Sequence, residues 1–109
     1  MSVKILLLED DAALAMGIEY SLKREGYEVT HISTFNEGKE WLQSYDKLKD
    51  IVGIFDVMLP DGNGFDLLRL MRDKKVDFPV IFLTAVSDEN NIVQGFDIGA
   101  DDYITKLVR

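Results

Sequence analysis

Three carboxylates in this sequence stand next to apolar runs, a position where a side chain can do chemistry. Asp56 ends the run at residues 51–55, and Glu9 and Asp10 follow the run at residues 3–8. Open α/β sheets bind ligands outside the carboxyl ends of their strands, so carboxylates in these places are available as nucleophiles or cation ligands. Asp56 is the first candidate for a reactive group.

Two further polar side chains take the same position. Thr84 follows the apolar run at residues 79–83, and Lys106 follows residues 103–105. In a parallel sheet they would share one edge with the three carboxylates, which would repel by about 3 kcal/mol per pair at roughly 5 Å and an effective dielectric of about 20. A bound cation would relieve that repulsion, and hard oxygen ligands suit Mg²⁺. Lys106 could add a compensating charge, and Thr84 a hydroxyl.

The elements that would position these side chains alternate along the chain. Apolar runs predict five strands, at residues 3–8, 27–32, 51–55, 79–83 and 103–105. Helical spacing predicts four helices: from Ala12 to the stop signal at Gly26, from Thr34 through Tyr45, from the turn at residues 60–62 to residues 72–75, and from near Ser87 to Gly99. Strict β-α alternation predicts an α/β fold, a doubly wound five-stranded parallel sheet with helices on both faces.

Local signals mark where two of the helices begin. Asp11 is placed to cap the first helix, and Thr34 and Glu37 have the spacing of a capping box. Asp61 is most simply a turn residue after a proline, and we assign His31 no role.

Composition excludes several classes of protein. The 109 residues, 47% of them hydrophobic, suit a single domain over residues 1–109. Without cysteine there is neither a disulfide nor a thiolate nucleophile, and with one histidine a zinc site would need carboxylates. The net charge of −8, with no cluster of basic residues, argues against direct nucleic-acid binding by this segment. The apolar run at residues 5–8 is far too short for a signal peptide or membrane span, so we expect a cytoplasmic protein.

Four motifs carry a family resemblance and occur in order on the expected elements. They are ILLLEDD at residues 5–11, DVMLPDG at 56–62, LTA at 83–85 and GADDYITK at 99–106. Together they resemble the receiver domain of bacterial two-component response regulators, over the whole chain. The resemblance implies a flavodoxin-like fold in which Asp56 accepts a phosphoryl group from the phosphohistidine of a sensor histidine kinase.

The resemblance also implies a metal site. Glu9 and Asp10 would hold Mg²⁺ together with Asp56 and the backbone carbonyl of Met58. Phosphoryl transfer needs an in-line nucleophile and charge neutralisation, and little other machinery. The domain would therefore assist its own phosphorylation and dephosphorylation without being an enzyme that acts on other substrates.

A switch is implied on the neighbouring strands. Thr84 would hydrogen-bond the phosphoryl oxygen, Lys106 would pair with it, and Tyr103 would swing inward on activation. The added charge could draw the loops of Thr84 and Lys106 toward Asp56. The helix expected between those loops contains Gly95, and its low stability makes it a candidate bistable element.

One departure from the family pattern concerns the last motif. Most receiver domains have proline after the lysine, often joined by a cis bond, whereas Leu107 follows Lys106 here. A non-proline cis bond costs about 2.5–4 kcal/mol, so this bond should be trans or strained for a purpose. Met58 and Val86 are apolar at the positions that govern water access to the acyl phosphate in the family, which predicts slow autodephosphorylation.

Three functions compete for this pattern of residues. The first is the phosphorylation switch. The second is a Mg²⁺-dependent phosphatase of the haloacid dehalogenase type, which expects a second carboxylate two residues after the nucleophile, where Met58 stands. The third is a receiver-like module that binds proteins without phosphorylation. Asp56, Thr84 and Lys106 taken singly would also suit an ordinary turn or surface, and only the joint pattern favours the switch.

The sequences of the turn after Asp56 and of residues 99–106 resemble those of one branch of the family, in which the receiver domain precedes a winged-helix DNA-binding domain. On that resemblance we expect a transcription regulator whose DNA-binding output module lies outside this segment. Homodimerisation is common in that branch. A fifth helix would normally follow Lys106, so we expect the domain to be truncated at its C-terminal end.

Overall fold

The computed structural model describes residues 3–45 and 50–83, together with the backbone of residues 84–85 and 102–106. Five parallel strands form the main sheet in the order β2-β1-β3-β6-β7. The strands are β1 Lys4–Leu8, β2 Glu28–Ile32, β3 Ile51–Asp56, β6 Val80–Ala85 and β7 Asp102–Lys106. The order reverses between β1 and β3, as in a doubly wound flavodoxin-like sheet. The predicted fold class is confirmed.

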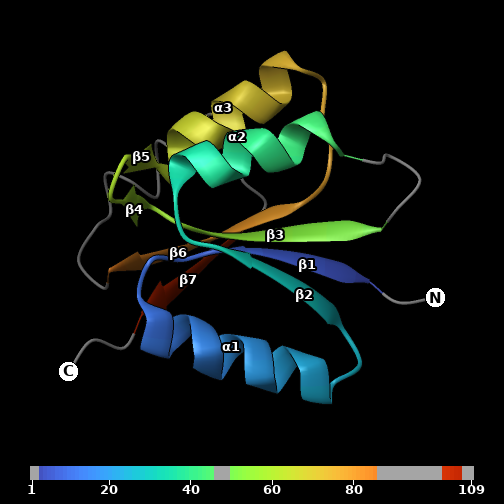
Figure 1. Ribbon diagram of the computed structural model, residues 1–109, viewed down its shortest axis with the longest axis vertical. Coiled ribbons are helices and arrows are strands. Elements are labelled where there is room, and N and C mark those ends of the chain that lie inside the picture. The colour runs from blue at the N-terminus through green and yellow to red at the C-terminus, as the bar shows by residue number, and fades with distance from the viewer. Residues whose placement is uncertain (1–2, 46–49, 86–101, 107–109) are drawn as a thin grey trace.

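Helices lie on both faces of this sheet (Figure 1). Helix α1 covers one face, and α2 and α3 lie side by side on the other. Their bounds are Ala12–Arg24, Phe35–Gln43 and Gly64–Asp73. Within the part of the chain that the structure describes, no helix is long and apolar enough to cross a membrane. The helix expected from Ser87 to Gly99 lies outside the described residues.

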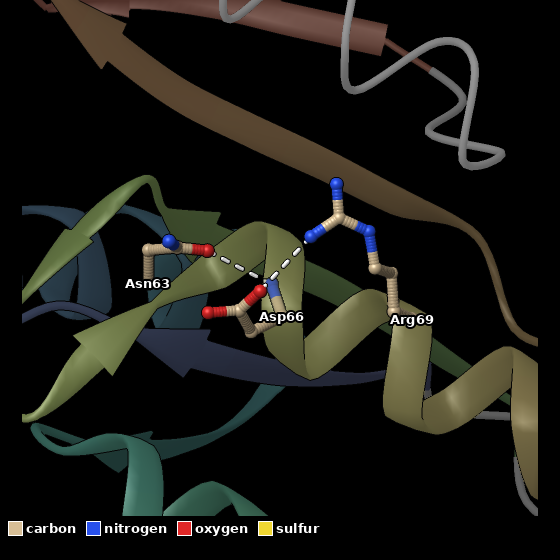
Figure 2. Close-up of polar contacts among 3 residues, drawn as sticks. All are labelled: Asn63, Asp66 and Arg69. Atoms are coloured by element: carbon tan, nitrogen blue, oxygen red, sulfur yellow. Dashed lines mark hydrogen bonds and ion pairs between the residues drawn. The ribbon is translucent and has the colours of Figure 1, made fainter.

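Capping side chains explain where the helices begin. Asp11 accepts hydrogen bonds from the backbone N–H groups of Ala13 and Leu14, and Thr34 accepts one from Glu37, so both predicted caps are confirmed. Helix α3 has a cap that the sequence interpretation missed. Asn63 accepts the backbone N–H of Asp66, whose carboxylate pairs with Arg69, as Figure 2 shows.

Two helices end in the same way although their residues differ. Gly26 follows α1 with φ of 93°, and Lys75 follows α3 with φ of 58°. In each case the next N–H reaches back to the last turn, from Tyr27 to Leu22 and from Val76 to Met71. This left-handed stop is natural for glycine and strained for lysine.

The main core lies between the sheet and the layer of α2 and α3. Strand residues Leu6, Leu8 and Phe55 meet helix residues there, and Phe82 packs edge-on against Phe55 and Phe65. The helices contribute buried residues that include Leu42, Leu67, Leu68 and Met71. Helix α1 is bound less deeply, since Ala15 alone among its residues is fully buried. The core thus holds β1 and β3 in place, the strands that end at the acidic residues, together with β6, the neighbour of β3.

The structure corrects the sequence interpretation at two strand ends. Thr84 lies within β6 and Lys106 is the last residue of β7, so neither follows its strand, whereas Asp56 is the last residue of β3, as expected. The turn after Asp56 contains a short antiparallel hairpin, β4 Met58–Leu59 with β5 Gly62–Asn63. Apolar runs mark where a strand is buried, whereas backbone pairing continues for a residue or two into the polar sequence.

Candidate functional site

The two strands that end at Glu9, Asp10 and Asp56, β1 and β3, are neighbours in the sheet. Leu8 of β1 pairs with Phe55 of β3, which brings the next residues, Glu9 and Asp56, to the same level. From this edge β1 leads to helix α1 on one face and β3 leads to α3 on the other (Figure 1). Ligands of open α/β sheets bind in the crevice that such diverging connections leave.

Glu9, Asp10 and Asp56 gather at this edge of the sheet. One carboxylate oxygen from each lies within 4.8 Å of the others. Glu9 has no exposed surface and Asp56 is 4% exposed, whereas Asp10 is open to solvent. The three predicted acidic residues therefore lie close together. Glu9 and Asp56 are buried, and Asp10 is exposed to solvent.

Backbone N–H groups fix the orientation of the two buried carboxylates. The N–H of Asp11 donates to Glu9 Oε2 at 3.0 Å, and the N–H of Met58 donates to Asp56 Oδ1 at 3.2 Å. Each donor lies two residues beyond its acceptor, so the chain direction after each strand sets the rotation of the side chain. These bonds give both carboxylates a defined direction at this edge of the sheet.

A close approach of helix α3 holds the end of β3. The N–H of Gly64 donates to the carbonyl of Val57 at 3.0 Å. A Cβ atom added at Gly64 would collide with the backbone carbonyl oxygen of Asp56 and would lie 2.8 Å from the ring of Phe82. Only glycine can start α3 this close to the strand.

The donor set fits a small divalent cation. Two carboxylates within 4.8 Å repel by about 3 kcal/mol at an effective dielectric of about 20, and burial of the charges adds a desolvation cost. All three donors are hard oxygens, the exposed Asp10 leaves one side open to water, and Mg²⁺ prefers a few carboxylates with several waters. These residues therefore suit Mg²⁺ and do not resemble a nitrogen or sulfur site.

The remaining predicted site residues reach the same edge through the backbone. Asp56 pairs in register with Leu83, the residue before Thr84, and Ala85 pairs with Lys106. The side chains of Thr84, Tyr103 and Lys106 lie outside what the structure describes, as do Val86 and Leu107. Met58 is described: the residue is 70% exposed, and its backbone N–H contacts the Asp56 carboxylate.

Two residues near the site were missed in the sequence. Asp61, interpreted as a plain turn residue, accepts hydrogen bonds from the backbone N–H groups of Phe35 at 2.6 Å and Asn36 at 3.0 Å. Partial desolvation raises the pKa of the Asp61 carboxyl, but hydrogen bonds from Asn36, Phe35 and its own N–H outweigh that effect and leave the pKa below its ordinary value.

His31, to which no role was assigned, lies at the end of β2. Its Nε2 atom is 2.7 Å from the backbone carbonyl oxygen of Glu9. A carbonyl can only accept, so Nε2 carries the proton in this contact. Both this contact and those of Asp61 join residues more than twenty positions apart, and no local sequence signal marks them.

Comparisons with known proteins agree with this geometry. The profile of the family described as the response regulator receiver domain matches residues 5–109. The alkaline phosphatase synthesis transcriptional regulatory protein PhoP of Bacillus subtilis is 37% identical over 106 residues, which make up 97% of this chain and 43% of PhoP. The cell cycle response regulator CtrA of Brucella ovis is 38% identical over 104 residues, 95% of this chain and 44% of CtrA.

A solved structure gives the same result for the fold. The non-phosphorylated HemR receiver domain from Leptospira biflexa superposes with a TM-score of 0.83 at 33% identity, over 99% of this chain and 85% of that one. The chain spans less than half the length of the two curated relatives.

Proposed function

Since the chain belongs to the response regulator receiver domain family, we propose that it is a phosphorylation switch whose phosphoacceptor is Asp56. The observation that carries the proposal is the acidic group at the β1 and β3 ends, in which Asp56 and Glu9 are buried and Asp10 is exposed. A phosphoryl donor would approach from the side of the exposed Asp10 toward Asp56, the last residue of the central strand β3.

The transfer itself needs few groups. A carboxylate oxygen of Asp56 attacks the phosphorus atom, the bond from phosphorus to the donor breaks, and the donor keeps the electron pair. A sensor histidine kinase would supply the phosphoryl group from a phosphohistidine, with imidazole as the leaving group. The N–H of Met58 holds the Asp56 carboxylate in one rotation, so the nucleophile is oriented before the donor arrives.

Glu9, Asp10 and Asp56, with the backbone carbonyl of Met58, would hold Mg²⁺ in this reaction. When bound, the ion would neutralise charge on the phosphoryl oxygens. Residues on the neighbouring strands would sense the product. Because aspartyl phosphate adds charge and acceptor oxygens, the hydroxyl of Thr84 and the ammonium of Lys106 would be drawn to it, and Tyr103 would move inward.

The output of the switch would lie outside this segment. PhoP is named as a transcriptional regulatory protein and CtrA as a cell cycle response regulator, and each is more than twice as long as the matched region. We propose that residues 1–109 form the receiver domain of a transcription regulator that binds DNA through another module. Homodimerisation on phosphorylation would then couple Asp56 to DNA binding.

Acetyl phosphate provides a direct test of the phosphoacceptor. With Mg²⁺, the intact protein should gain the mass of one phosphoryl group, and Asp56→Ala should not. Asp66→Ala is a matched control, because it removes an exposed carboxylate whose partner is Arg69. Modification that persists in Asp56→Ala would refute the assignment. Steady turnover of phosphate esters would favour a phosphatase, and no modification of the wild type would favour a binding module that acts without phosphorylation.

A further inference from the structure

One carboxylate ties the β4–β5 hairpin to the start of helix α2. Asp61 Oδ1 accepts the N–H of Phe35 at 2.6 Å, and Oδ2 accepts the N–H of Asn36 at 3.0 Å. Thr34 accepts the next N–H, that of Glu37. The amide groups of a first helical turn have no partner inside the helix and form its positive end. The helix therefore shares its first three amides between its own cap and the hairpin.

The same hairpin also rests on α2 through apolar contact. A Cβ atom added at Gly62 would lie 3.0 to 3.3 Å from side-chain atoms of Phe35. The polar tie at Asp61 and the packing at Gly62 thus act on one point of α2. Met58, whose backbone carbonyl is a proposed Mg²⁺ ligand, pairs with Asn63 in the other half of this hairpin.

The loop on the other side of the site is held from the same segment. The N–H of Glu9 donates to the carbonyl of Ile32 at 3.0 Å, and Nε2 of His31 donates to the carbonyl of Glu9 at 2.7 Å. The peptide groups on both sides of the Glu9 Cα are therefore bonded to the end of β2. These two hydrogen bonds hold the backbone of Glu9 in place, directly after the last residue of β1.

We propose that residues 31–36, which supply none of the acidic ligands, brace both loops that carry them, and that His31 and Asp61 are positioning residues for Mg²⁺. The inference deepens the proposed function and rests on it. Mg²⁺ demands near-ideal octahedral geometry, so small displacements of its ligands weaken binding. The segment meets one loop through His31 and the other through the amides that Asp61 accepts.

Calorimetric titration of the intact protein with Mg²⁺ tests the Asp61 side. Asp61→Ala should weaken Mg²⁺ binding about tenfold, the lower end of the effect expected for groups that support ligands. Asp66→Ala removes a comparable exposed carboxylate and should change the affinity by less than about twofold. Asp61→Asn keeps one acceptor oxygen, so its Mg²⁺ affinity should lie between those of wild type and Asp61→Ala. It also tests the inference if Asp61→Ala folds poorly.

Substitutions at His31, with Thr30→Ala as their control, test the contact with Glu9. His31→Ala should weaken Mg²⁺ binding severalfold, and His31→Gln, whose amide can still donate to the Glu9 carbonyl, should recover part of the loss. Thr30→Ala shortens a neighbouring exposed side chain on β2 and should leave the affinity unchanged. Equal Mg²⁺ affinities of His31→Ala and Thr30→Ala would overturn the proposed role of His31.

If Asp61 only positions the Mg²⁺ ligands, saturating Mg²⁺ should restore the phosphorylation rate of Asp61→Ala. The Mg²⁺ concentration that gives half the maximal rate of phosphorylation by acetyl phosphate should rise in Asp61→Ala, while the rate at saturating Mg²⁺ should return to that of the wild type. Circular dichroism must show that Asp61→Ala is fully folded without Mg²⁺, because in a partly unfolded variant Mg²⁺ would restore the rate by shifting the folding equilibrium. Equal Mg²⁺ affinities in Asp61→Ala and Asp66→Ala would overturn the inference, whereas a wild type with no Mg²⁺ binding that depends on Asp56 would overturn the proposed function itself.

Discussion

At the residue scale, the three acidic side chains divide the work of the site by their burial. Glu9 and Asp56 are enclosed and receive backbone N–H groups, while Asp10 faces solvent. A buried carboxylate has a defined direction and is expensive to leave uncompensated, whereas an exposed one adds charge at little cost. In the proposed function, this arrangement would give Asp56 a fixed direction as the nucleophile and leave the side of Asp10 open to the cation and the donor.

Asp61 should make stability depend on pH in the acid range. Its folded pKa is depressed below the ordinary value of 3.8, so its contribution is present above that value and is lost as pH falls through the folded pKa. Wild type should be more stable than Asp61→Asn at neutral pH, and the difference should shrink as pH falls below 3.8. Urea unfolding of both proteins across this range measures it, and a difference that does not change with pH would contradict the assignment.

Met58 should slow the loss of the phosphoryl group. Met58 is 70% exposed two residues after Asp56, and we expect its apolar side chain to hinder the approach of water to the acyl phosphate. We expect the purified phosphoprotein to release phosphate slowly and Met58→Asn to release it faster. Phosphate assays on both proteins provide the measurement, and rapid release from the wild type would rule the prediction out.

At the element scale, the start of α3 determines how closely this helix can approach β3, the strand that ends at Asp56. Gly64 begins the helix, donates to Val57 and lies against the carbonyl of Asp56. Asn63 caps the same turn, so position and direction of the helix are fixed together (Figure 2). The contact links the stability of α3 to the geometry of the site.

Two glycines should respond to alanine with opposite sign. Gly64→Ala places a Cβ against strand backbone that cannot move aside, and should destabilise the protein by about 1–3 kcal/mol. Gly17 lies within α1, and a Cβ atom added there would meet nothing beyond the helix's own backbone within 4 Å. Gly17→Ala should therefore stabilise the protein by about 0.5–1 kcal/mol. Denaturant unfolding of the two variants checks both signs, and a neutral Gly64→Ala would show that α3 can shift away from β3.

At the scale of the whole molecule, the site joins two layers of the fold. Helix α1 on one face and the α2–α3 layer on the other both connect to strands that end at the acidic group (Figure 1). A cation bound by both β1 and β3 would therefore stabilise the folded state as a whole. Ligand binding to the folded state alone adds about 2.7 kcal/mol when the free ligand is at about 100 times its Kd.

Asp10→Asn should separate charge repulsion from cation binding. Without divalent cation the variant should be more stable than wild type by about 0.5–1 kcal/mol, because one exposed member of the acidic group is neutral. With Mg²⁺ the order should reverse, since wild type gains more from the ion. Urea unfolding of both proteins, once with a chelator and once with Mg²⁺, measures this reversal in the order of stability. Asp66→Asn should shift stability equally in both conditions, and a parallel shift for Asp10→Asn would exclude Asp10 as a ligand.

The alternation of strands and helices, the caps at Asp11 and Thr34 and the acidic group at the strand ends could all be predicted from the sequence. These features depend on near neighbours in the chain or on the rule that parallel strands end at one edge. The family motifs then identified Asp56 as the phosphoacceptor candidate among several turn aspartates.

How the site is held could be learned only from the packed molecule. The contacts of Asp61 with the start of α2 and of His31 with Glu9 cross 22 to 26 residues of sequence, and the fit of Gly64 depends on how near α3 lies to β3. Such contacts follow from the packing of layers, which has no period or spacing in the sequence. Local chemistry therefore indicated which residues could react, and packing across the fold determined what positions them.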